Sequence, residues 1–438
     1  MKRRSMWIVL LTLAVLAAGT GLAGAKDVIR VWTYPVYHGY DVELAGLVEQ
    51  FEAENPDIDI EYEILSWLEG PQKFEVALNA GNPPDVFWGN PQPKYVQTGL
   101  VIDLYDFLSD EELAAYDKNL LDGFVIEGQL TGIPLYAGIW ALGGNKALLE
   151  EAGIDWETIQ VEGWTWDEFY SAVKKLTKTL PDGKKQWGFL MPGYNSELLE
   201  FLMLNNHAPQ VIKADGTFGW EEERVLEAMQ FIRKLMDEGL MPKEASGMAS
   251  ATSWEMFCNW DTAIQGRGIP YYDVMQKDRA ADIAAGKIEG RPIEYVCLPI
   301  PHNEGAPQGT IVRVAGYSVF RQLRYQGDAH TANAVKVARY LTSDAAAGAA
   351  IELACLPSSL KGQEVFDQEV RIEPYNNAFF KRQVAQINWP NMPMEYSTAE
   401  ARIRTEVILP TFQGLMAYEM TPEQAARTLI ERAERILR

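Results

Sequence analysis

The chain has 438 residues, of which 39 are basic and 61 acidic, so its formal net charge at pH 7 is −22. This charge repels nucleic acid and anionic lipid, and no basic cluster beyond the first residues offsets it. The length suggests two domains or one large one. The three cysteines are too far apart for metal-ligand spacing and too few for a disulfide scaffold, so we expect buried thiols at Cys258, Cys297 and Cys355.

The first 25 residues have the pattern of a secretory signal peptide. Lys2, Arg3 and Arg4 precede an apolar run from Met6 to Ala18, and small residues end the segment at Ala25. The run is too short to span a bilayer comfortably, and no second run of spanning length follows. We therefore expect a mature periplasmic or extracellular protein rather than one with a retained N-terminal anchor. No cysteine lies near the expected cleavage site, which excludes a lipid anchor on an N-terminal Cys.

The first elements of the expected mature chain alternate between strand and helix patterns. Residues 28–32 are β-rich, and residues 44–51 place apolar side chains at helical spacing. Residues 58–64 alternate as a second strand, 74–78 indicate a second helix, and 84–88 a third strand. A β–α–β order predicts a parallel sheet covered by helices.

Three later segments fit the capping box, in which a hydroxyl and a Glu or Gln three residues on satisfy the first amides of a helix. They begin at Ser109, Thr165 and Thr421. Further strands are expected at 187–190 and 262–264. Because no Ser/Pro-rich linker separates the halves, several short crossings should join two domains.

The sequence contains none of the common catalytic templates. A HExxH helix, a Gly-x-Ser-x-Gly elbow, a phosphate loop, a dinucleotide-binding Gly-x-Gly-x-x-Gly and a calcium loop are all missing. We therefore expect no catalytic residue, no metal and no cofactor. The plentiful carboxylates leave open an acid pair of the glycosidase kind.

Aromatic residues are unusually frequent, with 13 Trp and 19 Tyr. Their rings offer a flat apolar face and a polar edge, which suits contact with the C–H faces of sugar rings. Packing in the core is the alternative for each of them. Many stand beside Gly, Pro or Asn, outside the expected core elements: Tyr34, Tyr37, Tyr40, Trp67, Trp88, Tyr194, Tyr271, Tyr272 and Trp389.

The order of several motifs resembles the extracellular solute-binding proteins of ABC sugar importers, the family that includes maltose-binding proteins. The resemblance covers nearly the whole expected mature chain and is densest in its first half. The segments that carry it are Phe51–Ile58, Ala80–Phe87, Gly132–Pro134, Asn145–Ile154, Trp164–Phe169 with Lys175–Thr177, and Leu298–Pro301.

The resemblance implies an α/β, two-lobed periplasmic-binding-protein fold (type II), in which each lobe is a mostly parallel sheet flanked by helices. It also implies a monomer that captures a carbohydrate, most simply an oligosaccharide, in the cleft between the lobes and delivers it to transmembrane permease subunits. The implied division is 26–137 and 317–357 for the first lobe, 141–313 and 362–438 for the second, and 138–140, 314–316 and 358–361 for the hinge crossings.

The chain departs from the family pattern at two places where ligand would be touched. After Gly268 the stacking Trp of the family is replaced by Pro270, followed by Tyr271 and Tyr272. Before the second hinge crossing stands Arg313, where family members often have a small residue. These departures leave the identity of the solute open.

We predict that Trp88 borders the cleft with Asn90 beside it and that Trp389 lies on the rim. The facing loops, which follow the strands expected at 187–190 and 262–264, are predicted to supply Tyr194, Asn195, Arg267, Tyr271 and Tyr272. Two alternatives remain: a secreted carbohydrate-active hydrolase or lyase, and a binding protein for a phosphorylated or acidic ligand held by Arg267 and Arg313. The full set of predicted ligand-binding residues is Tyr34, Tyr37, His38, Trp67, Trp88, Asn90, Trp140, Tyr194, Asn195, Arg267, Tyr271, Tyr272, Arg313 and Trp389.

Overall fold

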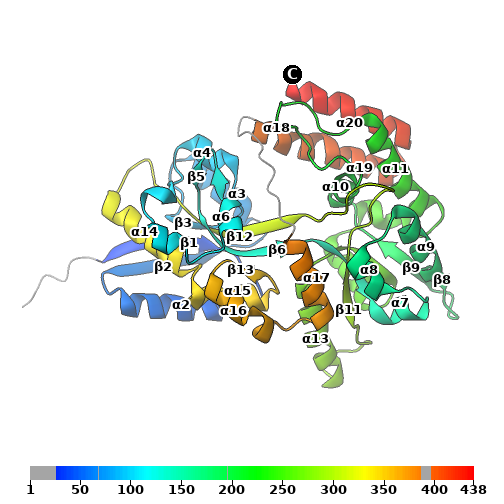
Figure 1. Ribbon diagram of the computed structural model, residues 1–438, viewed down its shortest axis with the longest axis horizontal. Helices are drawn as coiled ribbons and strands as arrows, with labels where there is room; N and C mark the ends of the chain where they lie inside the picture. The colour runs from blue at the N-terminus through cyan, green and yellow to red at the C-terminus, as the bar shows by residue number, and fades with distance from the viewer. Residues whose placement is uncertain (1–25, 68, 195, 386–395) are drawn as a thin grey trace, which may run out of the picture.

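The computed structural model describes residues 26–67, 69–194, 196–385 and 396–438, which form two lobes side by side (Figure 1). The first lobe contains a six-stranded sheet of order β13-β6-β12-β3-β1-β2, and the second a five-stranded sheet of order β11-β7-β10-β9-β8. Helices cover both sheets, as the predicted α/β class requires. A two-stranded hairpin of β4 (Val125–Ile126) and β5 (Gln129–Leu130) lies apart from them.

The strands of the first sheet are β1 (Asp27–Thr33), β2 (Ile58–Ile64), β3 (Val86–Gly89), β6 (Ile133–Ile139), β12 (Val312–Val319) and β13 (Leu356–Pro357). Its helices are α2 (Tyr40–Glu54), α3 (Gly70–Asn79), α4 (Pro93–Thr98), α5 (Asp110–Leu113), α6 (Lys118–Asp122), α14 (Asp328–Tyr340), α15 (Ala347–Glu352) and α16 (Leu360–Glu369), with short 3₁₀ turns at η1 (Leu104–Asp106) and η3 (Asp344–Ala346).

The strands of the second sheet are β7 (Ala141–Asn145), β8 (Lys178–Thr179), β9 (Lys185–Leu190), β10 (Thr262–Gly268) and β11 (Tyr295–Leu298). The remaining helices are α7 (Lys146–Glu151), α8 (Trp156–Glu162), α9 (Trp166–Leu176), α10 (Glu197–Leu204), α11 (Glu222–Asp237), η2 (Lys243–Gly247), α12 (Ser250–Cys258), α13 (Tyr271–Ala284), α17 (Pro374–Val384), α18 (Ser397–Arg402), the π-helical η5 (Ile403–Ile408), α19 (Leu409–Met416) and α20 (Pro422–Leu437).

Both sheets are mixed, which corrects the expectation of mostly parallel sheets. β1 pairs in parallel with β2 and β3, so the predicted β–α–β order is confirmed. However, β12 is antiparallel to β3 and β6, and β13 is antiparallel to β6. In the second sheet the pair of β9 and β10 is parallel, and the other pairs are antiparallel. The strands that cross between lobes return in the opposite direction and pair beside the parallel strands.

One residue separates the two sheets along the chain. β6 belongs to the first sheet and ends at Ile139, and β7 of the second sheet begins at Ala141. The residue between them is Trp140, whose N–H donates to the carbonyl of Ile311, just before β12 (3.0 Å). The connection is therefore a hydrogen-bonded crossing of two strands.

Local sequence signals account for the helices that the sequence predicted. The face of α2 that helical spacing selected is buried at Leu44, Leu47, Val48 and Phe51. All three capping boxes form with both hydrogen bonds present, at the starts of α5, α9 and α20. The three cysteines are free and buried, as expected.

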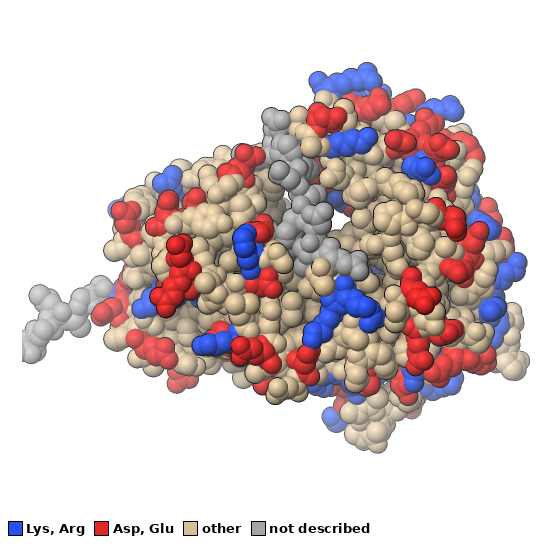
Figure 2. All heavy atoms as spheres, viewed as in Figure 1, with Lys and Arg blue, Asp and Glu red and all other residues tan. Residues whose placement is uncertain are grey.

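Acidic side chains are spread over both lobes on the face that Figure 2 shows. Within the described residues, no helix combines the length and the apolar character needed to cross a membrane.

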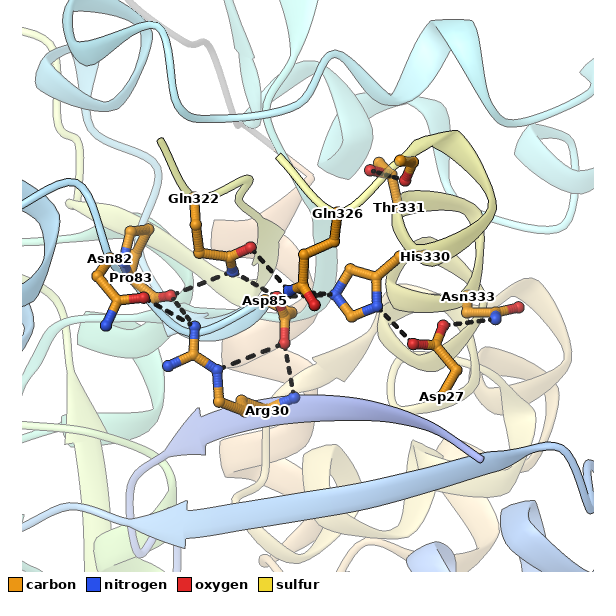
Figure 3. A network of polar contacts seen from close by, with 11 residues as sticks. Asp27, Arg30, Asn82, Pro83, Asp85, Gln322, Gln326, His330, Thr331 and Asn333 are labelled. Atoms are coloured by element: carbon orange, nitrogen blue, oxygen red, sulfur yellow. Dashed lines mark hydrogen bonds and ion pairs between the residues drawn. The ribbon is translucent and has the colours of Figure 1, made fainter. Parts of the chain in front are cut away.

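A buried polar network ties the start of the described chain to α14 (Figure 3). The His330 ring lies between two carboxylates, with Nδ1 2.7 Å from Asp27 Oδ1 and Nε2 3.1 Å from Asp85 Oδ1. The backbone N–H of Arg30 donates to the other oxygen of Asp85 (2.8 Å), and Asn333 donates to Asp27 (2.8 Å). β1, β3 and α14 are thus joined by hydrogen bonds as well as by packing.

Two opposing effects act on the pKa of His330. Burial lowers it, but the hydrogen bonds and charges of Asp27 and Asp85 outweigh burial and raise it above the usual 6.5. A raised folded-state pKa stabilises the fold below the pKa of the unfolded chain, and this contribution is lost as the pH rises through the folded-state value.

We therefore expect His330→Gln to reduce the free energy of unfolding more at about pH 5.5 than at about pH 8.5, because only the imidazolium pairs with both carboxylates. Urea unfolding of both proteins at the two pH values measures the difference. If the difference in free energy of unfolding between wild type and His330→Gln grows as the pH rises, His330 is neutral in the folded protein.

Candidate functional site

A continuous row of aromatic and basic side chains runs from the first lobe, across the crossing strands, to the second lobe. We call it the aromatic row. In the first lobe it comprises Tyr34, Trp67, Trp88 and Tyr136; at the crossing Trp140 and Arg313; and in the second lobe Arg267, Tyr194, Glu197 and Tyr272. Segments far apart in the sequence supply its members.

The first-lobe part begins where β1 and β3 end. Tyr34 follows β1 and stacks on Trp67, with ring centroids 4.5 Å apart and an angle of 17° between the planes. Trp88, on β3, meets both rings edge to face at 5.7 and 5.6 Å. Trp67 is 54% exposed, whereas Trp88 is only 5% exposed. Trp67 therefore presents a free ring face on a buried aromatic base.

The indole Nε1 of Trp88 is buried and has no hydrogen-bond partner among the described residues. An unpaired buried donor costs about 1–3 kcal/mol, so such groups are seldom left without a reason. A hydroxyl of a bound molecule could accept from it. Burial of Trp88 also means that truncation to Ala would create a core cavity.

Strand pairing places Tyr136 and Arg313 on one face of the first sheet. Ala315 pairs with Tyr136 and Arg313 with Gly138 in the antiparallel ladder of β6 and β12. Directly paired residues point to the same side, and alternate residues share a face. Tyr136 also reaches the ring of Trp88, at 6.4 Å between centroids. This ladder therefore extends the aromatic row from β3 toward the second lobe.

The indole ring of Trp140 carries two guanidinium groups. The central carbons of Arg267 and Arg313 lie 4.1 and 4.9 Å from its ring centroid, distances at which the ring face attracts a cation. Arg267 comes from β10 and Arg313 from β12. The crossing between the lobes is thus also the point where basic side chains from the two sheets meet.

In the second lobe, Arg267 is held on both sides. Its Nε lies 2.6 Å from Glu197 Oε2, and its Nη1 donates to the Tyr194 hydroxyl (2.8 Å). The carbonyl of Gly193, beside Tyr194, accepts from Gln413 of α19 (3.1 Å). The C-terminal helices therefore fix the loop that positions Arg267.

Tyr272 lies near these charges but does not belong to a loop. α13 begins at Tyr271, so both tyrosines stand in its first turn, and Arg267 lies within β10, which corrects the prediction that these three residues belong to loops. Pro270 precedes the helix, where its fixed φ is compatible with a helix start. Tyr272 packs on Trp254 at 4.6 Å between centroids. Burial raises the pKa of its phenol, and the charges of Arg267 and Arg313 partly oppose this.

Three other predicted residues, Tyr37, His38 and Tyr271, lie around the start of α2 and not in the aromatic row. The Tyr37 hydroxyl donates to Glu43. His38 is exposed, and its backbone N–H faces the Tyr271 hydroxyl, so these residues link the loop before α2 to α13. Asn90 is exposed at the end of β3. The predicted residues Asn195 and Trp389 lie outside the described residues.

Tyr136, Gly138 and Glu197 belong to the site but were missed as ligand-contact residues from the sequence. Gly138 was predicted only as part of the hinge crossing 138–140. A side chain at Gly138 would put its Cβ 3.0 Å from Cys355 Sγ and 3.3 Å from Arg313 Nε. Nothing in the local sequence identified Glu197 as the partner of Arg267.

A separate hollow of about 460 Å³ lies on the first lobe, between α2, α5 and α14. Its cations are already engaged: Arg339 lies 2.6 Å from Glu112, and Lys336 donates to Asn55. The aromatic row is the stronger candidate for a solute site because it combines the exposed ring of Trp67 with the buried, unpaired donors Trp88 Nε1 and Arg313 Nε of the described chain. In the described ranges, no group of three His, Cys, Asp or Glu is placed to hold a metal.

Comparison with known proteins identifies the family. The sequence model described as bacterial extracellular solute-binding protein matches residues 40–348. A binding protein of Brucella abortus (strain 2308) is 28% identical over 194 residues, which are 43% of this chain and 45% of that protein. The diacetylchitobiose binding protein DasA of Streptomyces coelicolor is 28% identical over 301 residues, 68% of this chain and 65% of that protein. The alignments thus span about half to two thirds of these relatives.

Among solved structures, an ABC substrate-binding protein of Listeria monocytogenes in complex with cycloalternan superposes with a TM-score of 0.73. The match covers 94% of this chain and 98% of that chain at 19% identity. At this identity the likeness establishes the fold, which is the predicted two-lobed periplasmic-binding-protein fold.

We expect Glu197→Gln to lower the free energy of unfolding by about 1.5–3 kcal/mol, because it removes the charged partner of Arg267 in a site where both side chains are about three-quarters buried (25% and 24% exposed). Glu434→Gln is the matched control, since its ion pair with Arg438 is exposed and should contribute about 0.5 kcal/mol or less. Denaturant unfolding compares the two variants, and equal losses would contradict a buried role for Glu197.

Proposed function

Because the chain belongs to the bacterial extracellular solute-binding protein family, we propose that it captures a carbohydrate, most simply an oligosaccharide, between its lobes and delivers it to the permease of an ABC importer. The observation that carries this proposal is the aromatic row, which places stacking surfaces and hydrogen-bonding groups from both lobes around one crossing. No bond needs to be made or broken in such a role.

The chemistry of the row suits a sugar. Trp67 offers an exposed ring face for a pyranose ring, with the buried ring of Tyr34 stacked against it, and aromatic residues bind ring ligands at about 1–3 kcal/mol per stacked ring in related cases. Trp88 Nε1 can donate to a hydroxyl. The names of relatives point the same way, since DasA binds diacetylchitobiose and the Listeria protein was solved with cycloalternan.

The proposal extends to where and how the protein works. The chain would be secreted with residues 1–25 as signal peptide, act as a monomer in the periplasm or outside the cell, and bend at 138–140, 314–316 and 358–361 between the lobes. A ligand that contacts both lobes binds the closed form more tightly and shifts the population toward it. The permease could then recognise the closed form of the protein.

The general test is a thermal-shift screen of mono- and oligosaccharides. A solute that binds the folded protein alone raises its melting temperature, by an amount set by its concentration relative to Kd. An oligosaccharide recovered unchanged after incubation supports binding, whereas released fragments would favour the hydrolase or lyase alternative.

We expect Trp67→Ala to weaken binding of the sugar found in the screen by about 1–3 kcal/mol, because the ring face lost is exposed and free to stack. The fold should tolerate the change better than Trp88→Ala. Tyr105→Ala removes an exposed aromatic from η1, away from the row, and serves as the control. Calorimetric titration gives both affinities, and equal affinities for Trp67→Ala and wild type would remove Trp67 from the site.

Closure predicts a change of shape in solution. On saturation with the same sugar, the radius of gyration should fall, because two lobes approach each other about hinges that are only a few residues wide. X-ray scattering with and without the sugar measures the change. Superimposable profiles at saturation would leave binding intact but reject closure as the signal for a permease.

A further inference from the structure

Arg313 is a half-buried cation at the centre of the aromatic row, and no carboxylate among the described residues pairs with it. Its Nε is buried and has no hydrogen-bond partner among the described residues. Its close neighbours are the Trp140 ring, Gly138 and the Cys355 thiol, which is at best a weak acceptor. A guanidinium in this setting lacks the oxygen acceptors that normally compensate for burial.

Other partly buried arginines do have such acceptors. Arg233 donates to the carbonyls of Leu415 and Met420, and Arg382 donates to the carbonyl of Gln160. Arg267, the second cation on Trp140, pairs with Glu197. The absence of an oxygen partner is therefore particular to Arg313 within this comparison.

Among the described residues, the charges around Trp140 leave one positive charge, that of Arg313, uncompensated. Arg267 and Glu197 neutralise each other at 2.6 Å, whereas Arg313 stands beside the same ring and adds its full charge. Two guanidinium groups this close repel each other. The whole chain has a formal net charge of −22, so carboxylates that could pair with a cation are plentiful in the sequence.

We propose that Arg313 is a specificity residue that selects solutes with one carboxylate, namely oligosaccharides containing a uronic acid. This inference rests on the proposed function and names its substrate class. The planar fork of a guanidinium matches a carboxylate with two parallel hydrogen bonds. One unpaired cation balances one carboxylate, whereas a phosphate ester carries nearly two negative charges and would leave one in excess.

The surrounding residues support such a contact. Gly138 leaves the space in which the Arg313 side chain lies, since a Cβ there would come within 3.3 Å of its Nε. The Trp140 ring fixes the guanidinium, and the exposed ring of Trp67, stacked on the buried Tyr34, continues the row for a neighbouring sugar ring. A uronic acid residue would thus be gripped at its carboxylate while the adjoining rings stack.

The test uses pairs of ligands that differ by one charge. Di- to tetrasaccharides of neutral sugars that carry a single galacturonate or glucuronate residue are titrated into the wild-type protein beside their methyl esters, which keep the shape and remove the negative charge. Neutral oligosaccharides of glucose, mannose and N-acetylglucosamine, and a sulfated disaccharide, complete the set. We expect one of the uronate series to bind about tenfold or more tightly than its ester.

Variants then assign the effect to Arg313. Arg313→Gln should remove the preference for acid over ester, and Arg313→Lys should keep part of it, since a lysine retains the charge without the planar fork. Arg427→Gln, an exposed arginine on α20, should behave as wild type. Because the ester comparison is made with unaltered protein, the proposal stays testable even if an Arg313 variant folds poorly.

The outcomes separate this inference from the proposed function. Tight binding of a neutral or sulfated sugar, with no gain from a carboxylate, would overturn the role of Arg313 and leave carbohydrate capture intact. Binding of a uronate that is equal in wild type and Arg313→Gln would also overturn it. If no saccharide in the set raises the melting temperature, carbohydrate capture itself fails, and the inference fails with it.

Discussion

The position of β12 between β3 and β6 is the constraint on which the candidate site depends. Tyr317 pairs with Trp88 on one side, while Arg313 pairs with Gly138 on the other. The close approach of β12 and β6 requires Gly316, whose added Cβ would lie 2.1 Å from the Ile133 carbonyl. The register shift between Ala315 and Gly316 then sets which face the later residues use. A one-residue slip would turn Arg313 away from Trp140.

The same ladder explains why cations can gather on an acidic protein. The net charge of the chain contributes only a weak electrostatic potential at the site, because salt screens charges that are more than about 10 Å away. Near Trp140, two strands from different sheets deliver Arg267 and Arg313 to one ring, and the local field is that of these groups and Glu197. The net charge of the chain therefore says little about what its site attracts.

Sequence patterns predicted those parts of the fold that depend on local interactions. Capping boxes at Ser109, Thr165 and Thr421 and the apolar face of α2 involve contacts within four residues, so spacing reveals them. The antiparallel return of β12 is a pairing with strands about 170 residues or more earlier, which no local pattern encodes. Motif order supplied the two-lobed fold, yet it could not supply that pairing direction.

The site divides in the same way. Aromatics beside Gly and Pro singled out Tyr34, Trp67 and Trp88, which the fold does gather. The same rule also selected Tyr37 and Tyr271, which meet around the start of α2 instead. Glu197 gave no signal, because an acid in an acidic chain is ordinary until its partner is known. Composition identifies the kind of surface, and only the fold decides which rings share it.

The unpaired atoms in the row bear on how binding and closure would be coupled. Among the described residues, Trp88 Nε1 and Arg313 Nε are buried without hydrogen-bond partners, and each such group costs about 1–3 kcal/mol as long as it stays unpaired. Both donors belong to strands of the first sheet, Trp88 to β3 and Arg313 to β12, so a solute can satisfy them by contact with the first lobe alone. Arg267 lies against the same Trp140 ring but belongs to β10 of the second sheet. A contact of the same solute with Arg267 would add affinity only in a form that holds the solute against both lobes, and a difference in affinity between two forms is what shifts a conformational equilibrium. The orphaned donors therefore bear on affinity, and the second-lobe groups bear on closure.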